Sequence, residues 1–454
     1  MKHGCPTLLP ALLPALLLAL CAAAAAAEGP QVFAIQGARI MRVSGPPIES
    51  GTVVVRDGII EAVGPNITAP ADAWVIEGKG LTVYPGLVDA LSTWGVPGLA
   101  PPAAIAGGRR GAGTPGAVAF PTAPQPVING PEDRPSNTSY LKIADQLVAT
   151  DASIATARDA GFTTAVTFPN TNIFAGQGAM FSLAGERPGQ MVVVPSAGLY
   201  LTMRSTSFAA YPGSLMGVIA YIRQIYLDAD HYKAANAIYT KHPQGLMRPA
   251  YDRTLEAVIN SPRTLLPAGR MVEIDRMLRL AQEMKMNAVL YGGDEAWRSV
   301  DSLQKAKVPV LVSLKWPERA RDADPALNDP LHELEMRDKA PSTPAALAKG
   351  GVKFAFYSDG IATPKEVVRA VKRAIDAGLA PADAVRAMTL SPAEIYGVAD
   401  RLGSIDKGKI ANLLVTEGDL FQDKTKVKYV FVDGMKYEPA PEVVPARGTT
   451  EKTQ

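Results

Sequence analysis

The feature that most constrains the fold is an alternation of short apolar strands with helices through the middle of the chain. Strands alternating with helices along a chain favour parallel pairing of the strands, with the helices as crossovers. A closed barrel of eight strands is the economical way to bury such a long series. The sequence therefore predicts an α/β fold, a (β/α)8 TIM-like barrel. The strands expected from the pattern are 163–169, 191–198, 287–291, 308–314 and 352–359, and the helices are 214–239, 273–284, 297–305 and 364–377.

Both ends of the chain have a different, β-rich pattern. Each end carries an Asp-Gly pair between apolar runs, Asp57-Gly58 and Asp433-Gly434, and this pair is a strong hairpin signal. The chain has 454 residues, which is long enough for more than one domain. We expect residues 28–84 and 402–438 to form one composite β-sandwich domain, and residues 85–401 to form the barrel.

Two segments have no strand or helix pattern. Residues 95–137 are rich in Gly, Pro and Ala, and they directly follow the first expected barrel strand. We therefore predict a long loop at the C-terminal rim of the barrel, where such barrels carry their active sites. Its arginines, Arg109 and Arg110, either bind an anion or belong to a solvated surface loop. The polar segment 439–454 is predicted to be a disordered tail.

The first 27 residues have the pattern of a secretory signal peptide. An apolar run, Leu8–Leu20, is followed by small residues at Ala22–Ala27, as at a cleavage site. The run is short for a membrane span, and the bulky residue before Cys21 disfavours a lipoprotein. We expect a cleaved signal at 1–27, a periplasmic or secreted location, and no stable membrane span after cleavage.

Charge and cysteine content exclude several classes of function. The net charge is +2, which gives no reason to expect nucleic acid or an acidic membrane surface as a partner. The two cysteines, Cys5 and Cys21, both lie in the expected signal. The mature chain therefore has no disulfide, thiolate nucleophile or cysteine metal site.

Several motifs resemble the amidohydrolase superfamily, especially its imidazolonepropionase-like branch. Residues 81–89 read LTVYPGLVD and resemble the start of that barrel, and residues 57–64 match the flanking sandwich strands. The Ser-Pro-Ala-Glu run at 391–394, followed by 403–413, resembles the return of the chain from the barrel to the sandwich. The resemblance extends from about Phe33 to about Lys436, and it implies the same fold as the alternating pattern does.

The same resemblance implies a metal site that this chain does not carry. Relatives hold one or two divalent metals with histidines and carboxylates, and the metal activates water. The histidine pair after the first strand falls at Leu91 and Thr93, and the later histidines fall near Pro267 and Gly292. Asp359 alone survives, at the position of the aspartate that binds metal and transfers a proton in relatives.

A histidine count supports this conclusion without an alignment. The sequence has four histidines, His3, His231, His242 and His332, and none is at an expected strand end. A two-metal site of this type requires about four histidines and an aspartate. We therefore predict no metal ligands and no cofactor; if the chain binds one, it is a divalent metal such as zinc, through Asp359.

Other candidate residues follow from the barrel pattern. Asn170, Asn172 and Gln177 follow the strand at 163–169, and they either orient a polar ligand or cap a tight glycine turn. Tyr291 ends the expected strand at 287–291, beside the position of the missing sixth-strand histidine. Its side chain either donates a hydrogen bond into the pocket or packs in the protein core. Asp89, retained from the resemblance, is expected to assist Asp359.

Two functions remain open. The first is a non-catalytic homologue whose barrel binds a small-molecule ligand or a partner, as a homo-oligomer or as a hetero-oligomer with an active paralogue. The second is a hydrolase of non-peptide C–N bonds, such as cyclic amides or acylated amines, with altered or no metal and with Asp359 as general base. A purely structural envelope protein has no specific support, and fold alone does not decide between these functions.

Overall fold

The computed structural model describes residues 32–99, 134–204, 211–319, 324, 326, 328–361, 363–422 and 424–439. The predicted signal peptide, residues 100–133 of the predicted rim loop and residues 440–454 of the predicted tail lie outside the described residues.

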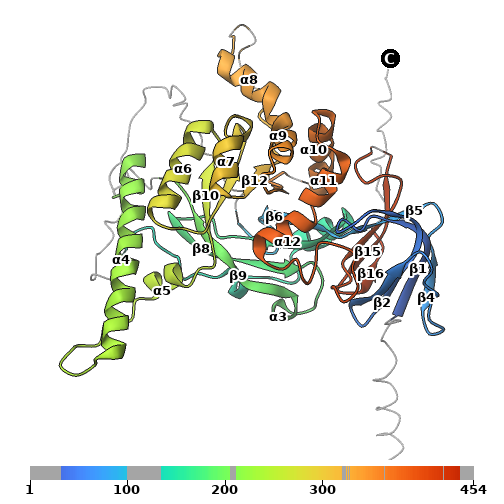
Figure 1. Cartoon of the computed structure of the whole chain (residues 1–454), viewed down its shortest axis with the longest axis horizontal. Helices are drawn as coiled ribbons and strands as arrows, with labels where there is room; N and C mark the ends of the chain where they lie inside the picture. The colour runs from blue at the N-terminus through green and yellow to red at the C-terminus, as the bar shows by residue number, and fades with distance from the viewer. Residues whose placement is uncertain are drawn as a thin grey trace, which may run out of the picture.

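The described chain is an α/β protein with two sheets of eight strands each. The first sheet is built from both chain ends, in the order β16-β15-β14-β5-β1-β2-β3, with β4 paired to β1 (Figure 1). An edge-to-face contact between Phe33 and Phe431, with ring centroids 5.4 Å apart, joins the two ends in its core. The strands are β1 Val32–Ile40, β2 Ile48–Arg56, β3 Ile59–Gly64, β4 Trp74–Glu77, β5 Leu81–Pro85, β14 Leu413–Glu417, β15 Lys426–Val432 and β16 Met435–Tyr437.

The second sheet is the expected TIM-like barrel. Its strands run in the order β6 to β13, and β13 lies beside β6, so that the sheet is nearly closed. The strands are β6 Leu87–Ser92, β7 Phe162–Thr167, β8 Phe174–Ser182, β9 Val192–Leu201, β10 Thr264–Ala268, β11 Ala288–Gly292, β12 Val310–Ser313 and β13 Phe354–Tyr357. These strands are short and almost wholly buried, which is why they appear in the sequence as continuous apolar runs.

One barrel strand departs from the parallel pattern. β8 pairs antiparallel with both β7 and β9, whereas the other neighbouring strands are parallel. Gln177 was expected after the second strand, either to orient a ligand or to cap a glycine turn, and this placement is corrected because it lies within β8. All nine residues of β8 are buried. Glycine at 178 is required, because a Cβ there would stand 2.3 Å from the Phe168 ring.

Helices cover the outside of the barrel, and several flank β10 and β12 in Figure 1. They begin where the sequence supplies caps: α10 starts at Pro364 after Thr363, whose hydroxyl accepts a hydrogen bond from the Glu366 amide, as N-cap residues do. The helices are α2 Ala152–Asp159, α3 Pro188–Met191, α4 Leu215–Lys241, α5 Arg253–Ile259, α6 Met271–Glu283, α7 Val300–Ala306, α8 Leu331–Lys339, α9 Thr343–Lys349, α10 Pro364–Asp376, α11 Pro381–Ala387 and α12 Leu390–Tyr396, with short 3-10 turns at Ile143–Asp145, Ala296–Arg298 and Ala340–Ser342.

The two ends of the barrel differ. At the N-terminal end, α12 packs into the interior core, where the Tyr396 hydroxyl donates to the Ala90 carbonyl at 2.7 Å. The Tyr396 ring also meets Arg263, which directly precedes β10. This end is therefore closed, and the open side lies at the C-terminal ends of the strands. Within the described residues, no helix is both long and apolar enough to cross a membrane.

Candidate functional site at the barrel mouth

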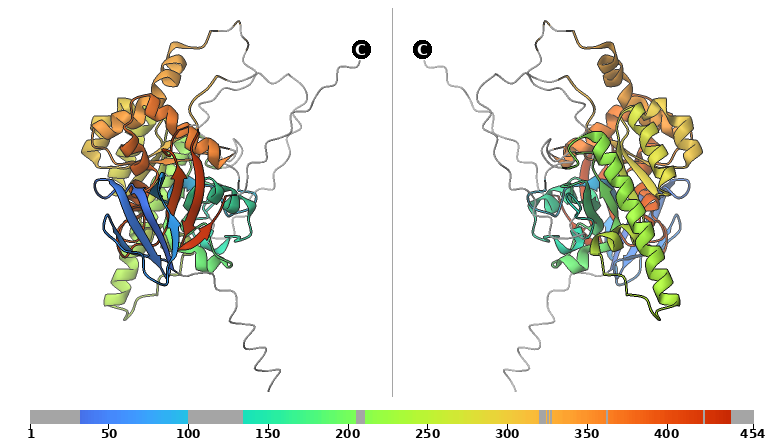
Figure 2. Two further views of the ribbon diagram at one scale, coloured as in Figure 1. Left: turned by 90° about the vertical axis from the view of Figure 1, so that its right-hand side faces the viewer. Right: turned by 90° about the vertical axis from the view of Figure 1, so that its left-hand side faces the viewer.

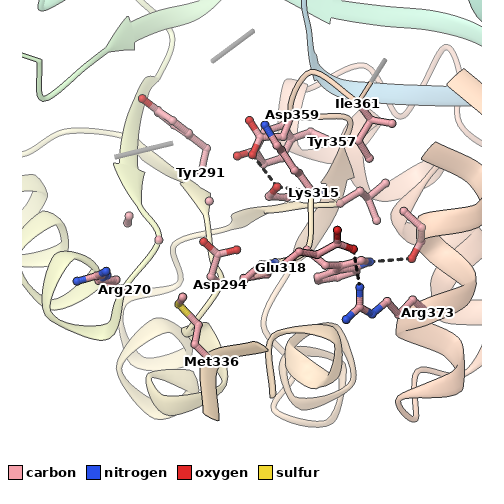
Figure 3. A pocket seen from close by; sticks show the side chains of 18 of the residues that line it. Arg270, Tyr291, Asp294, Lys315, Glu318, Met336, Tyr357, Asp359, Ile361 and Arg373 are labelled. Atoms are coloured by element: carbon pink, nitrogen blue, oxygen red, sulfur yellow. Dashed lines mark hydrogen bonds and ion pairs between the residues drawn. The ribbon is translucent and has the colours of Figure 1, made fainter. Parts of the chain in front are cut away.

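A cavity of about 840 Å³ lies at the C-terminal ends of β10 to β13 (Figure 3). This volume falls within the range of about 300–1,000 Å³ that is typical of small-molecule sites. Carboxylates, basic side chains and aromatic rings all face it. Its lining includes Pro267, Arg270, Glu273, Tyr291, Gly292, Asp294, Ser313, Lys315, Trp316, Glu318, Tyr357, Asp359, Arg369 and Arg373.

Asp359 stands in this cavity directly beyond β13. Its backbone is left-handed, with φ of 48°, and its carboxylate Oδ2 accepts a hydrogen bond of 2.7 Å from the Ser313 hydroxyl at the end of β12. Burial raises the pKa of Asp359 to about 6, although the Ser313 hydrogen bond and the Lys315 ammonium oppose the shift. In Figure 3 the Lys315 amine extends toward Asp359. The carboxylate is therefore fixed in direction, and with a pKa of about 6 it is mostly ionised at neutral pH.

Asp294, two residues beyond β11, is a second acidic group in the cavity. Burial, together with the neighbouring charges of Asp359 and Glu273, raises its pKa to about 7. Two carboxyl groups with such pKa values facing one cavity are able to donate and accept protons near neutral pH. The sequence analysis did not single out Asp294 or Lys315. The sequence feature that could have indicated them is their position, two residues beyond the ends of β11 and β12.

Asp89 lies in β6, deeper in the barrel, and does not line the cavity. Its Oδ1 accepts hydrogen bonds from the amides of Leu91 at 3.3 Å and Ser358 at 3.1 Å. Its Oδ2 has no hydrogen-bond partner among the described residues. Complete burial raises its pKa to about 7, and the charge of Asp359 adds to the shift. Through the Ser358 amide, Asp89 holds the backbone that leads into Asp359.

Aromatic side chains fill the barrel interior beside the acidic groups. The Tyr291 ring stacks on Tyr200, with centroids 4.8 Å apart, and its hydroxyl donates to the Leu201 carbonyl at 3.0 Å. Burial raises the pKa of Tyr291 well above its usual value. Tyr291 lines the cavity, but its hydroxyl is already used inside the protein, so the packing alternative considered from the sequence describes it better.

The three amide residues predicted beside the second strand do not line this cavity. Gln177 is buried, and its amide group donates to the carbonyls of Ser139 and Ala257 and accepts from Ser196. Asn172 donates to the Thr138 hydroxyl at 3.1 Å and has a φ of 70°. Asn170 is buried. In this arrangement, Gln177 and Asn172 hold β8 and the preceding turn to neighbouring segments.

The donor set at the cavity does not fit the metal site that the resemblance implies. Leu91 is buried in the barrel core, and Thr93 is absent from the cavity lining. Pro267 and Gly292 do line the cavity, but neither has a side chain that binds metal. His231 and His332 are exposed on α4 and α8. Among the described residues, no three His, Cys, Asp or Glu side chains are grouped closely enough to hold a metal ion.

The outer part of the cavity carries charges of both signs. Arg373 pairs with Glu318 at 3.4 Å, and the Trp316 indole donates to the Ala370 carbonyl at 3.0 Å (Figure 3). These contacts fix one wall, on α10. Arg270 begins the opposite wall, at the start of α6. The cavity therefore combines an acidic floor with a mixed, partly basic rim, which suits a small polar molecule.

Comparison with known proteins places this fold. Residues 318–436 match the amidohydrolase family. An amidohydrolase from Thermotoga maritima MSB8 is 25% identical, with a TM-score of 0.71, and the match covers 89% of this chain and 100% of that one. A Xaa-Pro dipeptidase with bound methionine is 15% identical, with a TM-score of 0.52, and the match covers 90% of this chain and 100% of that one. Molinate hydrolase is also 15% identical, with a TM-score of 0.50, and the match covers 90% of this chain and 95% of that one. No curated protein sequence matches this chain.

The last two structures share the fold only. The match to the Thermotoga maritima structure extends over most of the chain, and the family match includes Asp359, α10 to α12, β14 and β15. The chain thus has the fold of the amidohydrolases, and its C-terminal part matches the amidohydrolase family in sequence.

Proposed function

We propose that this chain is an exported amidohydrolase-fold protein that binds a small polar molecule at the barrel mouth and does not use the metal-dependent hydrolysis of its relatives. The observation that carries the proposal is the donor set at the cavity. At the positions where the family resemblance places histidines, this chain has Leu91, Thr93, Pro267 and Gly292. Pro267 and Gly292 line a cavity of about 840 Å³.

The pocket is suited to holding a ligand. Aromatic and aliphatic side chains line it beside the charged rim, and its inner polar groups converge from the ends of β11, β12 and β13. Apolar walls supply most of the binding free energy of a small ligand, and a few fixed polar groups set its orientation. Ser313 and Lys315 hold Asp359 in one direction, so that this carboxylate is ready to meet a donor group.

The test is ligand capture by the mature protein. Native mass spectrometry of the purified protein identifies a co-purified molecule, and thermal-shift screening of polar metabolites tests for binding. We expect Asp294→Asn to weaken binding at least about tenfold, since it removes a charge-assisted contact of about 1.4 kcal/mol or more. Asp376→Asn, on the exposed side of α10, is the matched control. Binding that is equal in both variants contradicts the proposal.

A second candidate function is metal-independent hydrolysis of a non-peptide C–N bond, in a cyclic amide or an acylated amine. The observation that favours it is Asp359, whose pKa is raised to about 6 and whose Oδ2 is oriented by Ser313. A general base must be ionised, so the rate should rise with pH and level off above about 6. Turnover with that profile, lost in Asp359→Asn, would establish this function in place of the first.

A further inference from the structure

The long helix α4, Leu215–Lys241, extends beyond the barrel. Its buried residues are Val218, Tyr221, Ile222, Ile225 and Ala229, which all lie in its first fifteen residues. From Asp230 to Tyr251, which includes the segment after the helix, no residue is buried. Figure 2 shows this part of α4 reaching past the rest of the barrel. We call residues 227–251 the α4 arm.

An apolar stripe runs along the side of α4 that faces away from the barrel. Met216 is 81% exposed, Leu227 is 55% exposed and Ile238 is 57% exposed. Ala220 and Ala234, both exposed, lie between them on the same side, since residues three, four and seven apart share a helix face. Beyond the helix, Met247 is 93% exposed and Tyr251 is 71% exposed.

This arm is difficult to explain in a single copy. None of the last twelve residues of the helix is fully buried, and Tyr232 alone among their hydrophobic side chains packs partly against the core. So short a stretch is marginal as a helix in water, and a row of large apolar side chains in solvent marks an interaction site. The arm contains 25 residues, close to the roughly 20–30 residues that each side of a standard interface uses.

Charge along the arm identifies the partner. Asp230 lies toward its start, and Lys233 and Lys241 lie toward the end of the helix; Asp228 already pairs with Arg134 of the same chain at 3.5 Å. Two copies related by a two-fold axis pair their helices antiparallel, because the same patch meets itself. That pairing brings the acidic part of each helix to the basic part of the other. Parallel pairing would place like charges side by side.

We propose that the α4 arm is the dimer interface of this protein, with a second copy of the same chain as its occupant. With the two-fold axis midway between Leu227 and Ile238, each Leu227 packs against Ile238 of the other copy. The small side chain of Ala234 lies near the axis and lets the helices approach closely. Asp230 of one copy then lies on the same flank as Lys233 of the other.

The experiment measures the mass of the mature protein by sedimentation velocity across a range of concentrations. We expect a dimer that Leu227→Glu or Ile238→Glu dissociates, with Kd raised at least tenfold. Both side chains are exposed in the single copy, so these variants should fold, and an unchanged circular dichroism spectrum checks this. Leu331→Glu, at the exposed start of α8, is the matched control and should leave the dimer intact.

Two further measurements make the test specific. Asp230→Lys should weaken the dimer and Asp230→Lys with Lys233→Asp should restore it, because the pair is exchanged in both copies. In Ala234→Cys, a short bis-maleimide should join two chains, whereas the same cysteine at Leu331 should not. A wild-type protein that stays monomeric at tens of micromolar, or a dimer unaffected by both glutamate variants, overturns the proposal.

Discussion

The buried carboxyl of Asp89 should make the stability of this protein depend on pH. Complete burial raises the pKa of Asp89 from 3.8 to about 7. Between those values the folded chain keeps a proton that the unfolded chain has lost, so the free energy of unfolding falls as pH rises. Each unit of pKa shift corresponds to roughly 1.36 kcal/mol. Above pH 7 the charged form of Asp89 therefore lowers the free energy of unfolding by about 4 kcal/mol, and about 3 kcal/mol of this loss develops between pH 5 and pH 8.

Replacing Asp89 with asparagine tests this reasoning. The asparagine oxygen can still accept from the Leu91 and Ser358 amides, while the buried charge is lost. Urea denaturation should show that the stability of the variant relative to wild type increases by about 3 kcal/mol from pH 5 to pH 8. Because the difference between two pH values is measured, any packing effect of asparagine cancels. Asp376→Asn, at an exposed site, should show no such difference, and an equal effect of Asp89→Asn at both pH values would refute the argument.

Three further substitutions distinguish structural from ligand-binding roles. Gln177→Leu should lower the free energy of unfolding by about 3 kcal/mol or more, because it leaves several buried partners unpaired. Denaturation and binding titrations in parallel should show that the ligand affinity is unchanged. Ser313→Ala should raise the pKa of Asp359, measured by NMR titration, because it removes the hydrogen bond that stabilises the charged form. Tyr291→Phe should cost about 1–2 kcal/mol of stability through the unpaired Leu201 carbonyl, and loss of ligand binding with unchanged stability would show instead that its hydroxyl serves the ligand.

The sequence predicts the barrel because its strands are short, apolar and separated by amphipathic helices. The strand at 352–359 and the helix at 364–377 agree with β13 and α10 to within about two residues. β8 could not be found this way. Its glycines favour a turn locally, and only close packing against Phe168 explains why glycine at 178 lies in a strand.

The candidate site was predictable in part for a similar reason. Asp359 follows a recognisable strand, and its position beside a cavity agrees with that pattern. Asp294 and Lys315 become relevant only once β11 and β12 are neighbours and their ends meet. Gln177 was predicted beyond the second strand, in a turn or a ligand site, but it lies in an antiparallel strand, and the buried partners of its amide are distant in sequence.

The central claim is that the barrel mouth does not hold the family's catalytic metal. The most direct test is the metal content of the purified mature protein after incubation with zinc, manganese or iron and removal of free ions, with Asp359→Ala measured in parallel. Neither protein is expected to retain stoichiometric metal. One or more equivalents of metal per chain in the wild type, lost in Asp359→Ala, would contradict it.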